Sequence, residues 1–320
     1  MSPAVAVGVC RLEGPVGRVM EGTAMIRRVL VALVLVLVVS GLGLRAEGRH
    51  NAGALAAGKT FTLGNIGWDE DVAVNNVVQV LLQDKYGYTV NQKLADAGIL
   101  YQGVASGSLD AFLDTWLPKT HATYWARYHS MVVKLPPWYK GVANLGLAVP
   151  NYVKAQSIAD LNTYRSQFGG TITGIEPGAG EMRIVQTKVV PGYGLHYSVL
   201  ASSTPAMLAA LKAAIQHRRP IVVTLWKPHW AFTAYPVRYL KDPKGLMGGT
   251  EQVAGIVRKG LQKDAPQAYD LLSHLTLNEQ QLGTLELAIK GAKDPATGAR
   301  TWVKKNQSLV NKWLEGIPKS

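Results

Sequence analysis

The sequence predicts an α/β protein of two lobes, joined by a hinge with a cleft between them. Strand-like and helix-like segments alternate from residue 58 to about 150, and a second alternating block continues to about 235. This alternation is typical of a mostly parallel sheet with helices on both faces. We expect lobe 1 to comprise residues 58–150 and 236–320, and lobe 2 to comprise residues 151–235. Two crossings between the lobes would form the hinge.

Lobe 1 is expected to begin with a buried strand, followed by a helix over 72–86 whose apolar spacing is helical and which Gly87 ends. The full expected order is a strand at 60–68, a helix at 72–86, a strand at 88–94, a helix at 99–107, a strand at 109–116, a helix at 120–129 and a strand at 141–150.

Lobe 2 is expected to repeat this alternation, with Ser157 and Asp160 capping its first helix and with Thr204 and Pro205 starting its third. The expected order is helix 157–168, strand 170–176, helix 178–190, strand 196–203, helix 204–218 and strand 220–226. The remaining segments predict a helical tail that packs on lobe 1, with helices at 251–262, 266–275, 277–291 and 295–316.

The N-terminal segment predicts export. A basic pair and then an apolar run over 29–39 follow Met25, which is the layout of a secretory signal peptide. We expect this peptide to span 25–46, with cleavage as late as residue 56 left open, and residues 1–24 to be a start-site extension. A retained membrane anchor is the alternative, although the run is shorter than the roughly 20 residues that cross a bilayer.

Composition limits the classes of function. The chain has 320 residues, of which 48% are hydrophobic and 17% charged, and its formal net charge is +13. The basic residues are scattered without a stripe or an RNA-binding motif, so we expect no nucleic-acid partner. The one cysteine, Cys10, excludes an intrachain disulfide and a Cys-rich metal site. We expect a monomer with no cofactor and no metal, and export away from ATP argues against a kinase.

Three tryptophans stand at or near the ends of predicted strands: Trp68, Trp116 and Trp226. Ligands of open α/β sheets bind beyond the carboxyl ends of the strands, so closure of the lobes would gather three indole faces. Such a cage suits a quaternary ammonium, because each cation–π contact contributes roughly 0.5–2 kcal/mol. Micromolar affinity needs about 8 kcal/mol, so we expect a second anchor.

Donors for a carboxylate are the expected second anchor. "ITGIEPGAGEM" predicts a strand, a glycine-rich loop and a helix, whose backbone N–H groups can hold an anion. His121 adds a side-chain donor, stronger if it is protonated. The acids of "WDED", residues 69–71, are expected to be solvated, and His229 to support the site without contacting the ligand. The remaining tryptophans are expected to be structural: Trp125, Trp138, Trp230, Trp302 and Trp313.

Several blocks together resemble the substrate-binding proteins of glycine betaine/proline betaine ABC importers: "GWDEDVAVNNVV", "DTWLPKTH", "TGIEPGAGEM", "IVVTLWKPHWAF", "YLKDPKG" and "VRKGL". The resemblance spans about residues 60–315. It implies a two-lobed, type II-like periplasmic-binding-protein fold and a soluble periplasmic receptor that passes its ligand to a permease with a cytoplasmic ATPase. It also implies a prism of Trp68, Trp116 and Trp226 for the trimethylammonium group, and His121 with the amides of Gly174 and Ile175 for the carboxylate.

Other functions stay open at this point. The same fold could serve choline or carnitine, although choline has no carboxylate and would leave His121 and the Gly174 loop idle. An exported hydrolase using Asp69 or His121, and a sensor domain that reports to a membrane kinase, are alternatives from other classes. Lys119 and Lys227 flank the tryptophan motifs, and we expect both to point away from a bound cation.

Overall fold

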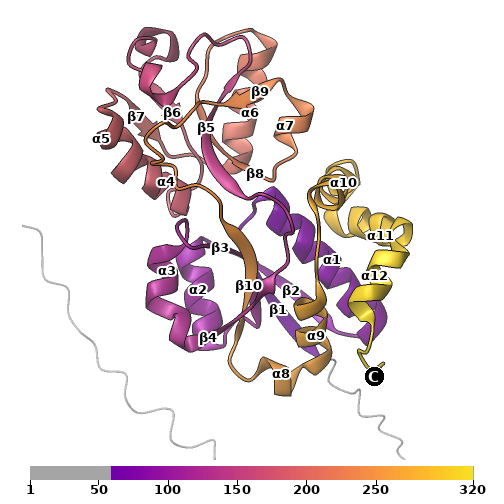
Figure 1. Ribbon diagram of the computed structural model, residues 1–320. Coiled ribbons are helices and arrows are strands. Elements are labelled where there is room, and N and C mark those ends of the chain that lie inside the picture. Colours follow the sequence, from indigo (N-terminus) through magenta and orange to yellow (C-terminus); the bar gives the residue numbers. More distant parts are fainter. Residues whose placement is uncertain (1–58, 320) are drawn as a thin grey trace, which may run out of the picture. The chain divides into compact units, whose positions relative to one another are not determined.

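The structure, a computed structural model, describes residues 59–319, whose strands form two five-stranded sheets (Figure 1). The first sheet has the order β2-β1-β3-β10-β4, and its strands are β1 (Thr60–Asn65), β2 (Thr89–Leu94), β3 (Ala111–Leu117), β4 (Val132–Pro137) and β10 (Gln252–Arg258). Strand β1 pairs parallel with β2 and β3, whereas β10 runs antiparallel to β3 and β4. The predicted start-site extension and signal peptide lie outside the described residues.

The second sheet has the order β7-β6-β8-β5-β9. Its strands are β5 (Asn144–Pro150), β6 (Thr171–Thr173), β7 (Ser198–Leu200), β8 (Val223–Lys227) and β9 (Val237–Tyr239). The expected changeovers near Pro150 and Pro236 fall at the end of β5 and directly before β9. Because these strands pair within the second sheet, the chain changes lobe before β5 and again after β9.

Helices cover both sides of the first sheet. On one side lie α2 (Ala97–Ser106) and α3 (Ala122–Tyr128), with the short turn η1 (His129–Met131) after them (Figure 1). On the other side lie α1 (Asp69–Tyr86), α10 (Glu279–Lys290), α11 (Pro295–Lys305) and α12 (Gln307–Leu314). Helix α1 contacts α9 (Pro266–His274), α10 and α11, so the tail packs on this lobe as predicted. A further short helix, α8 (Leu261–Asp264), precedes α9.

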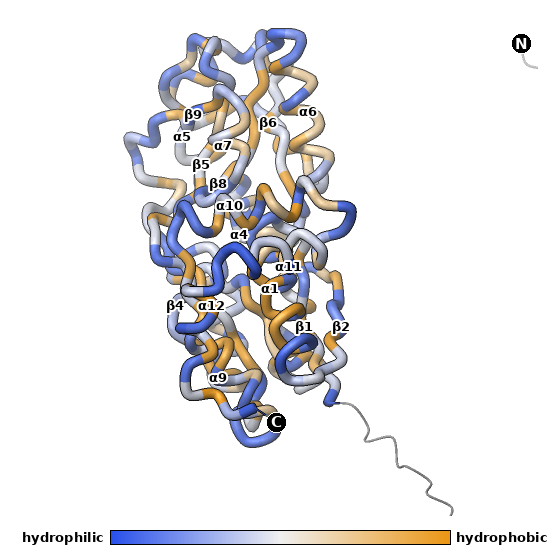
Figure 2. Tube along the Cα trace, turned by 90° about the vertical axis from the view of Figure 1, so that its right-hand side faces the viewer, coloured by the Kyte–Doolittle hydropathy of each residue, from blue (hydrophilic) through white to orange (hydrophobic). Residues whose placement is uncertain are grey.

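Helix α1 shows how local sequence sets an element. Its valines and leucines at 74, 77, 78, 81 and 82 form a buried stripe, and Figure 2 shows the hydrophobic colouring along this helix. Gly87 follows at φ 68°, a conformation that glycine adopts without steric cost, and its N–H bonds the carbonyl of Gln83. The predicted helix end is therefore confirmed, while its start lies at Asp69, directly after Trp68.

The second lobe carries shorter helices: η2 (Ile158–Asp160), η3 (Arg165–Phe168), α4 (Gly180–Ile184), the π-helical η4 (Val185–Val189), α5 (Val190–Tyr193), α6 (Thr204–Gln216) and α7 (Ala231–Ala234). The capping box of Ser157 and Asp160 is confirmed, but the predicted helix over 157–168 is wrong. The side chain of Asn162 bonds the backbone of Gly194 and His196, which ties this segment to a neighbouring loop. Ser203, not Thr204, caps α6.

The helix predicted over 251–262 is also wrong, because residues 252–258 form strand β10 between β3 and β4. An apolar run of this length fits a buried strand as well as a helix, and only the two neighbouring strands decide. Strand β4 had no counterpart in the prediction. The expected long terminal helix is interrupted at Asn306, which separates α11 from α12.

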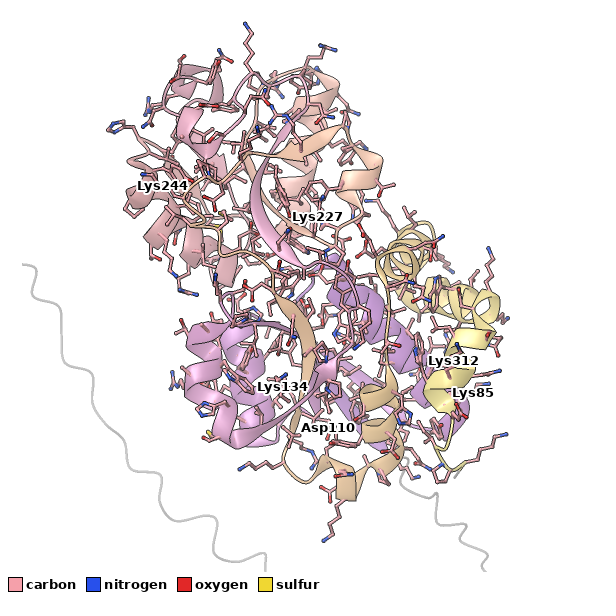
Figure 3. The ribbon with its side chains drawn as sticks, viewed as in Figure 1. Lys85, Asp110, Lys134, Lys227, Lys244 and Lys312 are labelled. Carbon is pink, nitrogen blue, oxygen red and sulfur yellow. The ribbon has the colours of Figure 1, made fainter. Side chains whose placement is uncertain are left out.

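Two further features of residues 59–319 concern the length of the apolar helices and the positions of the lysines. Within residues 59–319 no helix combines the length and the hydrophobicity that crossing a bilayer requires. Lys134 on β4, Lys244 between β9 and β10, and Lys312 on α12 are labelled at three distant places in Figure 3, while Lys85 on α1 is labelled beside Lys312.

Candidate functional site

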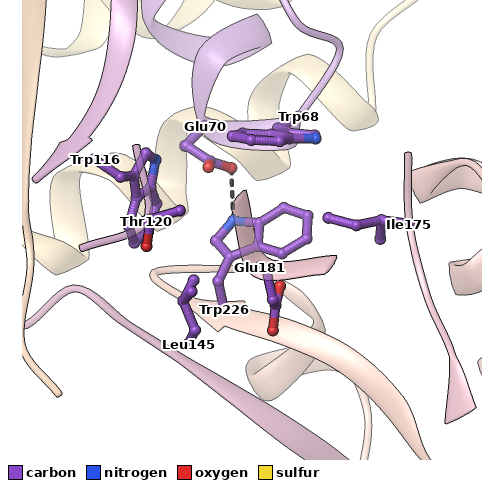
Figure 4. A pocket seen from close by; sticks show the side chains of 8 residues that line it. All are labelled: Trp68, Glu70, Trp116, Thr120, Leu145, Ile175, Glu181 and Trp226. Carbon is purple, nitrogen blue, oxygen red and sulfur yellow. Dashed lines mark hydrogen bonds between the residues drawn. The ribbon is translucent and has the colours of Figure 1, made fainter. Parts of the chain in front are cut away.

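One pocket receives residues from both lobes (Figure 4). The first lobe supplies the side chains of Trp68, Glu70, Trp116 and Thr120, and the second lobe supplies those of Leu145, Ile175, Glu181 and Trp226. Trp116 lies on β3 and Trp226 on β8, while Trp68 directly precedes α1. Since β1 and β3 run parallel, Trp68 and Trp116 emerge at the same edge of the first sheet.

The structure brings the three predicted tryptophans together. All three are buried, and the ring centroids of Trp68 and Trp226 lie 5.8 Å apart with their planes at 47°. Trp116 lines the same pocket from the side (Figure 4). Indole rings from two lobes thus meet around one small space.

Each indole N–H is tied to a carboxylate beside the pocket. Trp226 Nε1 donates to Glu70 Oε2 at 2.9 Å, and Trp68 Nε1 donates to Glu176 Oε2 at 3.2 Å. Trp116 Nε1 donates to Asp114 Oδ1 at 2.8 Å. The first two bonds connect the lobes to each other. These bonds hold the ring edges and so fix the orientation of the π faces in this arrangement of the lobes.

His121 is a neutral donor next to the cage. Its Nδ1 accepts the backbone N–H of Trp116 at 3.2 Å, so the neutral ring carries its proton on Nε2. Burial, with the Arg183 charge, lowers the pKa of His121 to about 3. The ring is therefore neutral near neutral pH, and the stronger, protonated form of this donor does not apply. The ring stacks on Trp68 at 6.0 Å, and its Nε2 is buried with no partner among the described residues.

The glycine-rich loop contributes less backbone than predicted. The N–H of Gly174 donates to the carbonyl of Leu200 at 2.9 Å, so the sheet already uses it. A Cβ at Gly174 would lie 2.3 Å from the sulfur of Met182, which explains the glycine by close packing. Ile175 lines the pocket, and its N–H has no acceptor among the described residues. Helix α4 begins at Gly180, two residues later than expected.

Acidic side chains line the pocket, and the sequence did not indicate them. Glu70 and Asp71 are fully buried, so the expectation that "WDED" is solvated is wrong for these two, and Asp69 is half-buried with its Oδ2 3.2 Å from Nε2 of His229. Burial raises the pKa of Glu70, Asp71 and Glu181 well above the usual range. Both carboxyl oxygens of Glu181 are buried without a hydrogen-bond partner in the described part of the chain. Spacing along a sequence gives no signal for such burial.

His229 and the two lysines that flank the tryptophan motifs contact groups outside the pocket lining. His229 packs edge-on against Trp226 with ring centroids 4.8 Å apart, and its Nδ1 accepts the N–H of Ala231 at 3.0 Å. Lys227, labelled in Figure 3, lies over the ring of Phe232 at 4.8 Å. Lys119 donates from Nζ to the carbonyl of Gly248. Neither lysine lines the pocket.

The lobes touch closely beside the pocket. Tyr124 Oη donates to the carbonyl of Gly178 at 2.8 Å, and Arg183 Nη2 donates to the carbonyl of Thr120 at 3.3 Å. A Cβ at Gly180 would lie only 2.1 Å from the oxygen of Thr120. Glycine is therefore required at 180 for this closed arrangement.

Known proteins share this architecture. The chain is 39% identical over 156 residues to the glycine betaine/carnitine transport binding protein GbuC of Listeria monocytogenes serotype 1/2a (strain 10403S). That match covers 48% of this chain and 52% of GbuC, about half the length of the relative. The crystal structure of lactococcal OpuAC in its closed-liganded conformation with glycine betaine superposes with a TM-score of 0.75 at 38% identity, covering 80% of this chain and 100% of OpuAC.

A second solved structure gives the same result. The glycine betaine/L-proline-binding protein ProX from Borrelia burgdorferi has a TM-score of 0.75 at 31% identity, covering 82% of this chain and 97% of ProX. The predicted two-lobed fold is thereby confirmed. Residues 59–305 match the family described as the substrate binding domain of the ABC-type glycine betaine transport system, and the chain belongs to that family.

Proposed function

We propose that the chain captures glycine betaine or a related betaine between Trp68, Trp116 and Trp226 and delivers it unchanged to an ABC permease with a cytoplasmic ATPase. The observation that carries this proposal is the pocket itself, where three buried indoles from two lobes surround one space. A ligand that touches all three rings favours the closed arrangement, because each lobe alone offers only part of the cage.

The walls of the pocket suit a cation without N–H groups. The π faces attract a quaternary ammonium and offer no strong acceptor for a hydrogen bond. The indole N–H groups are engaged by Glu70, Glu176 and Asp114 and point away from the ring faces. The carboxyl oxygens of Glu70 and Glu181 add partial negative charge to the same walls even when these groups carry their protons. A trimethylated nitrogen meets these conditions better than a primary amine does.

The opposite end of the ligand is expected to be a carboxylate. His121 Nε2–H is buried and unpartnered among the described residues, and an unsatisfied buried donor costs about 1–3 kcal/mol unless a ligand uses it. The N–H of Ile175 supports the same assignment. Choline would leave these donors unused, so the geometry favours a betaine over choline. Binding in this way requires no catalytic group of the kind that a hydrolase uses.

The proposal places the protein outside the cytoplasm. The signal-peptide pattern after Met25 and the membership in a family of transport substrate-binding domains support this location. The partners are then the betaine and a membrane permease, and we expect the receptor to act as a monomer.

Calorimetric titration of the purified protein with glycine betaine, choline and dimethylglycine tests the assignment. Glycine betaine should bind most tightly, because choline lacks the carboxylate and dimethylglycine brings an N–H into an aromatic cage. Proton NMR of the ligand after incubation should show no conversion. Tighter binding of choline, or no heat with any quaternary amine at millimolar concentration, would contradict the proposal.

A further inference from the structure

Two buried carboxyl groups lie beside the cage, and neither has a basic partner within residues 59–319. Glu70 on α1 and Asp114 on β3 are both fully buried. Glu70 Oε2 accepts the indole N–H of Trp226, and Asp114 Oδ1 accepts that of Trp116. Each group keeps one oxygen, Glu70 Oε1 and Asp114 Oδ2, without a donor among the described residues. The arrangement leaves each acid half satisfied.

A proton between the two acids completes the arrangement. Two ionised carboxylates at close range in a buried site repel each other, so one of them retains a proton. Asp114 and Glu70 act on each other electrostatically, and each has one oxygen without a donor among the described residues, so a proton on either of these oxygens can bridge the pair. The chain that results runs from Trp116 through Asp114 and Glu70 to Trp226, and it crosses from one lobe to the other.

We infer that Glu70 and Asp114 form a proton-sharing carboxyl pair that orients Trp226 and Trp116, and that a quaternary ammonium in the cage binds with release of a proton from this pair. This inference rests on the proposed function for the identity of the ligand. It makes both acids positioning residues for the cage and couples its affinity to pH.

The electrostatics give the sign of the coupling. Burial raises the pKa of Asp114 to about 7, while burial and the charge of Asp114 hold the pKa of Glu70 well above its usual range. Near neutral pH the pair therefore exchanges between a neutral form with two protons and an anionic form with one. A cation nearby stabilises the anionic form and lowers the pKa of the pair in the complex. Affinity is then highest above pH 7 and falls as the pH drops.

The surroundings strengthen this behaviour. The titratable groups that interact with the pair or line the pocket beside it are acids or a phenol: Asp71 on α1, Glu286 on α10, Glu181 on α4 and Tyr101 on α2. His121 stays neutral throughout the range because its pKa is about 3. None of these groups supplies a positive charge that would keep the pair ionised without a ligand.

Calorimetry of glycine betaine binding tests the inference directly. Titrations near pH 7 in phosphate and in Tris should give different apparent enthalpies, and the difference should correspond to release of part of a proton. The dissociation constant should be several-fold lower at about pH 8 than at about pH 5.5, with a slope of at most tenfold per pH unit. Equal enthalpies in both buffers and a flat profile would overturn the inference.

Two amide variants locate the effect. In Glu70→Gln and Asp114→Asn the amide keeps an acceptor for the indole and a donor for the partner acid, and the repulsion between two carboxylates is gone. Burial still raises the pKa of whichever acid remains. Asp114→Asn removes the group that titrates near neutral pH, so its affinity should become flat between about pH 6 and 8, whereas Glu70→Gln leaves Asp114 to titrate and should keep a slope. A retained wild-type slope in Asp114→Asn would contradict the assignment.

A matched control separates the loss of pH dependence from a general loss of stability. Asp110 directly precedes β3 and pairs with Arg258 at 2.7 Å, and it does not line the pocket. Asp110→Asn should lower thermal stability but keep the wild-type pH slope and proton release. Absence of glycine betaine binding at every pH would contradict the proposed function. Binding that does not depend on pH would contradict only the inference about the proton-sharing pair.

Discussion

The two tryptophan–proline segments, 115–121 and 225–230, contain similar residues whose histidines make different contacts. In both, a tryptophan at the end of a strand is followed by a cis X–Pro bond and a histidine. His121 turns its Nδ1 back to the N–H of Trp116 and leaves Nε2 without a partner among the described residues. His229 bonds the N–H of Ala231 instead, and its Nε2 lies 3.2 Å from Asp69.

The distance from the proline explains the difference. His121 follows Pro118 by three residues, so the turn between them brings the ring back under Trp116. His229 follows Pro228 directly, and its ring lies edge-on to Trp226. One motif therefore supplies a free donor beside the cage, and the other supplies support for a cage wall. Substitutions of the two histidines should therefore change ligand affinity by different amounts.

Loss of a cage wall should have the largest effect. Trp116→Ala removes one π face, and a dry cation–π contact is worth about 2 kcal/mol, so affinity for glycine betaine should fall about 30-fold. Trp116→Phe keeps a face and should lose less, although it also frees Asp114 Oδ1 from its indole donor. Tryptophan fluorescence titration measures both variants. Equal losses in the two would show that the ring face is not what binds.

Removal of the free donor should rank second. His121→Ala deletes Nε2–H, and a hydrogen bond to a charged group is worth about 1.5 kcal/mol, so glycine betaine should bind about tenfold more weakly. Choline has no carboxylate and should lose far less. Because the ring is already neutral, the loss should be the same at pH 6 and pH 8. An equal loss for choline would assign His121 to packing against Trp68.

The tryptophans could be predicted because strand ends of an α/β sheet converge, whatever the details of the turns. Glu70, Asp114 and Glu181 could not be predicted, since an acid after a tryptophan or within a strand looks the same in sequence whether it is solvated or buried. Their burial arises only when α1, β3 and α4 come together at the pocket.

The errors in the fold have a similar origin. Residues 252–258 contain Val253, Ile256 and Val257, whose spacing suits either a helix or a strand, and pairing with β3 and β4 selects the strand. The amide of Gly174 was assigned to the ligand from a motif, but the register of β6 against β7 commits it to Leu200. Long-range pairing decided both cases.

A larger side chain at the contact between the lobes should reduce the affinity by a smaller factor. In Gly180→Ala the new Cβ meets the carbonyl oxygen of Thr120, in the first tryptophan–proline segment, and relieving this overlap costs on the order of 1 kcal/mol. Affinity should therefore fall about fivefold, by calorimetry, while the melting temperature of the free protein changes little. Gly283→Ala, on α10 with open space around its Cβ, is the matched control and should bind as the wild type does. Unchanged affinity in Gly180→Ala would mean that binding does not require this contact.

The supporting histidine should give the smallest effect. His229→Asn keeps a side-chain acceptor for the N–H of Ala231 but removes the ring that packs against Trp226. An edge-on aromatic pair contributes about 0.5–1 kcal/mol, so affinity should fall about threefold, for glycine betaine and choline alike. That lack of discrimination is the contrast with His121→Ala, which weakens only the carboxylate ligand. If His229→Asn instead changed the ratio between the two ligands, the second histidine would have to reach the carboxylate, and the division of roles between the two segments would be wrong.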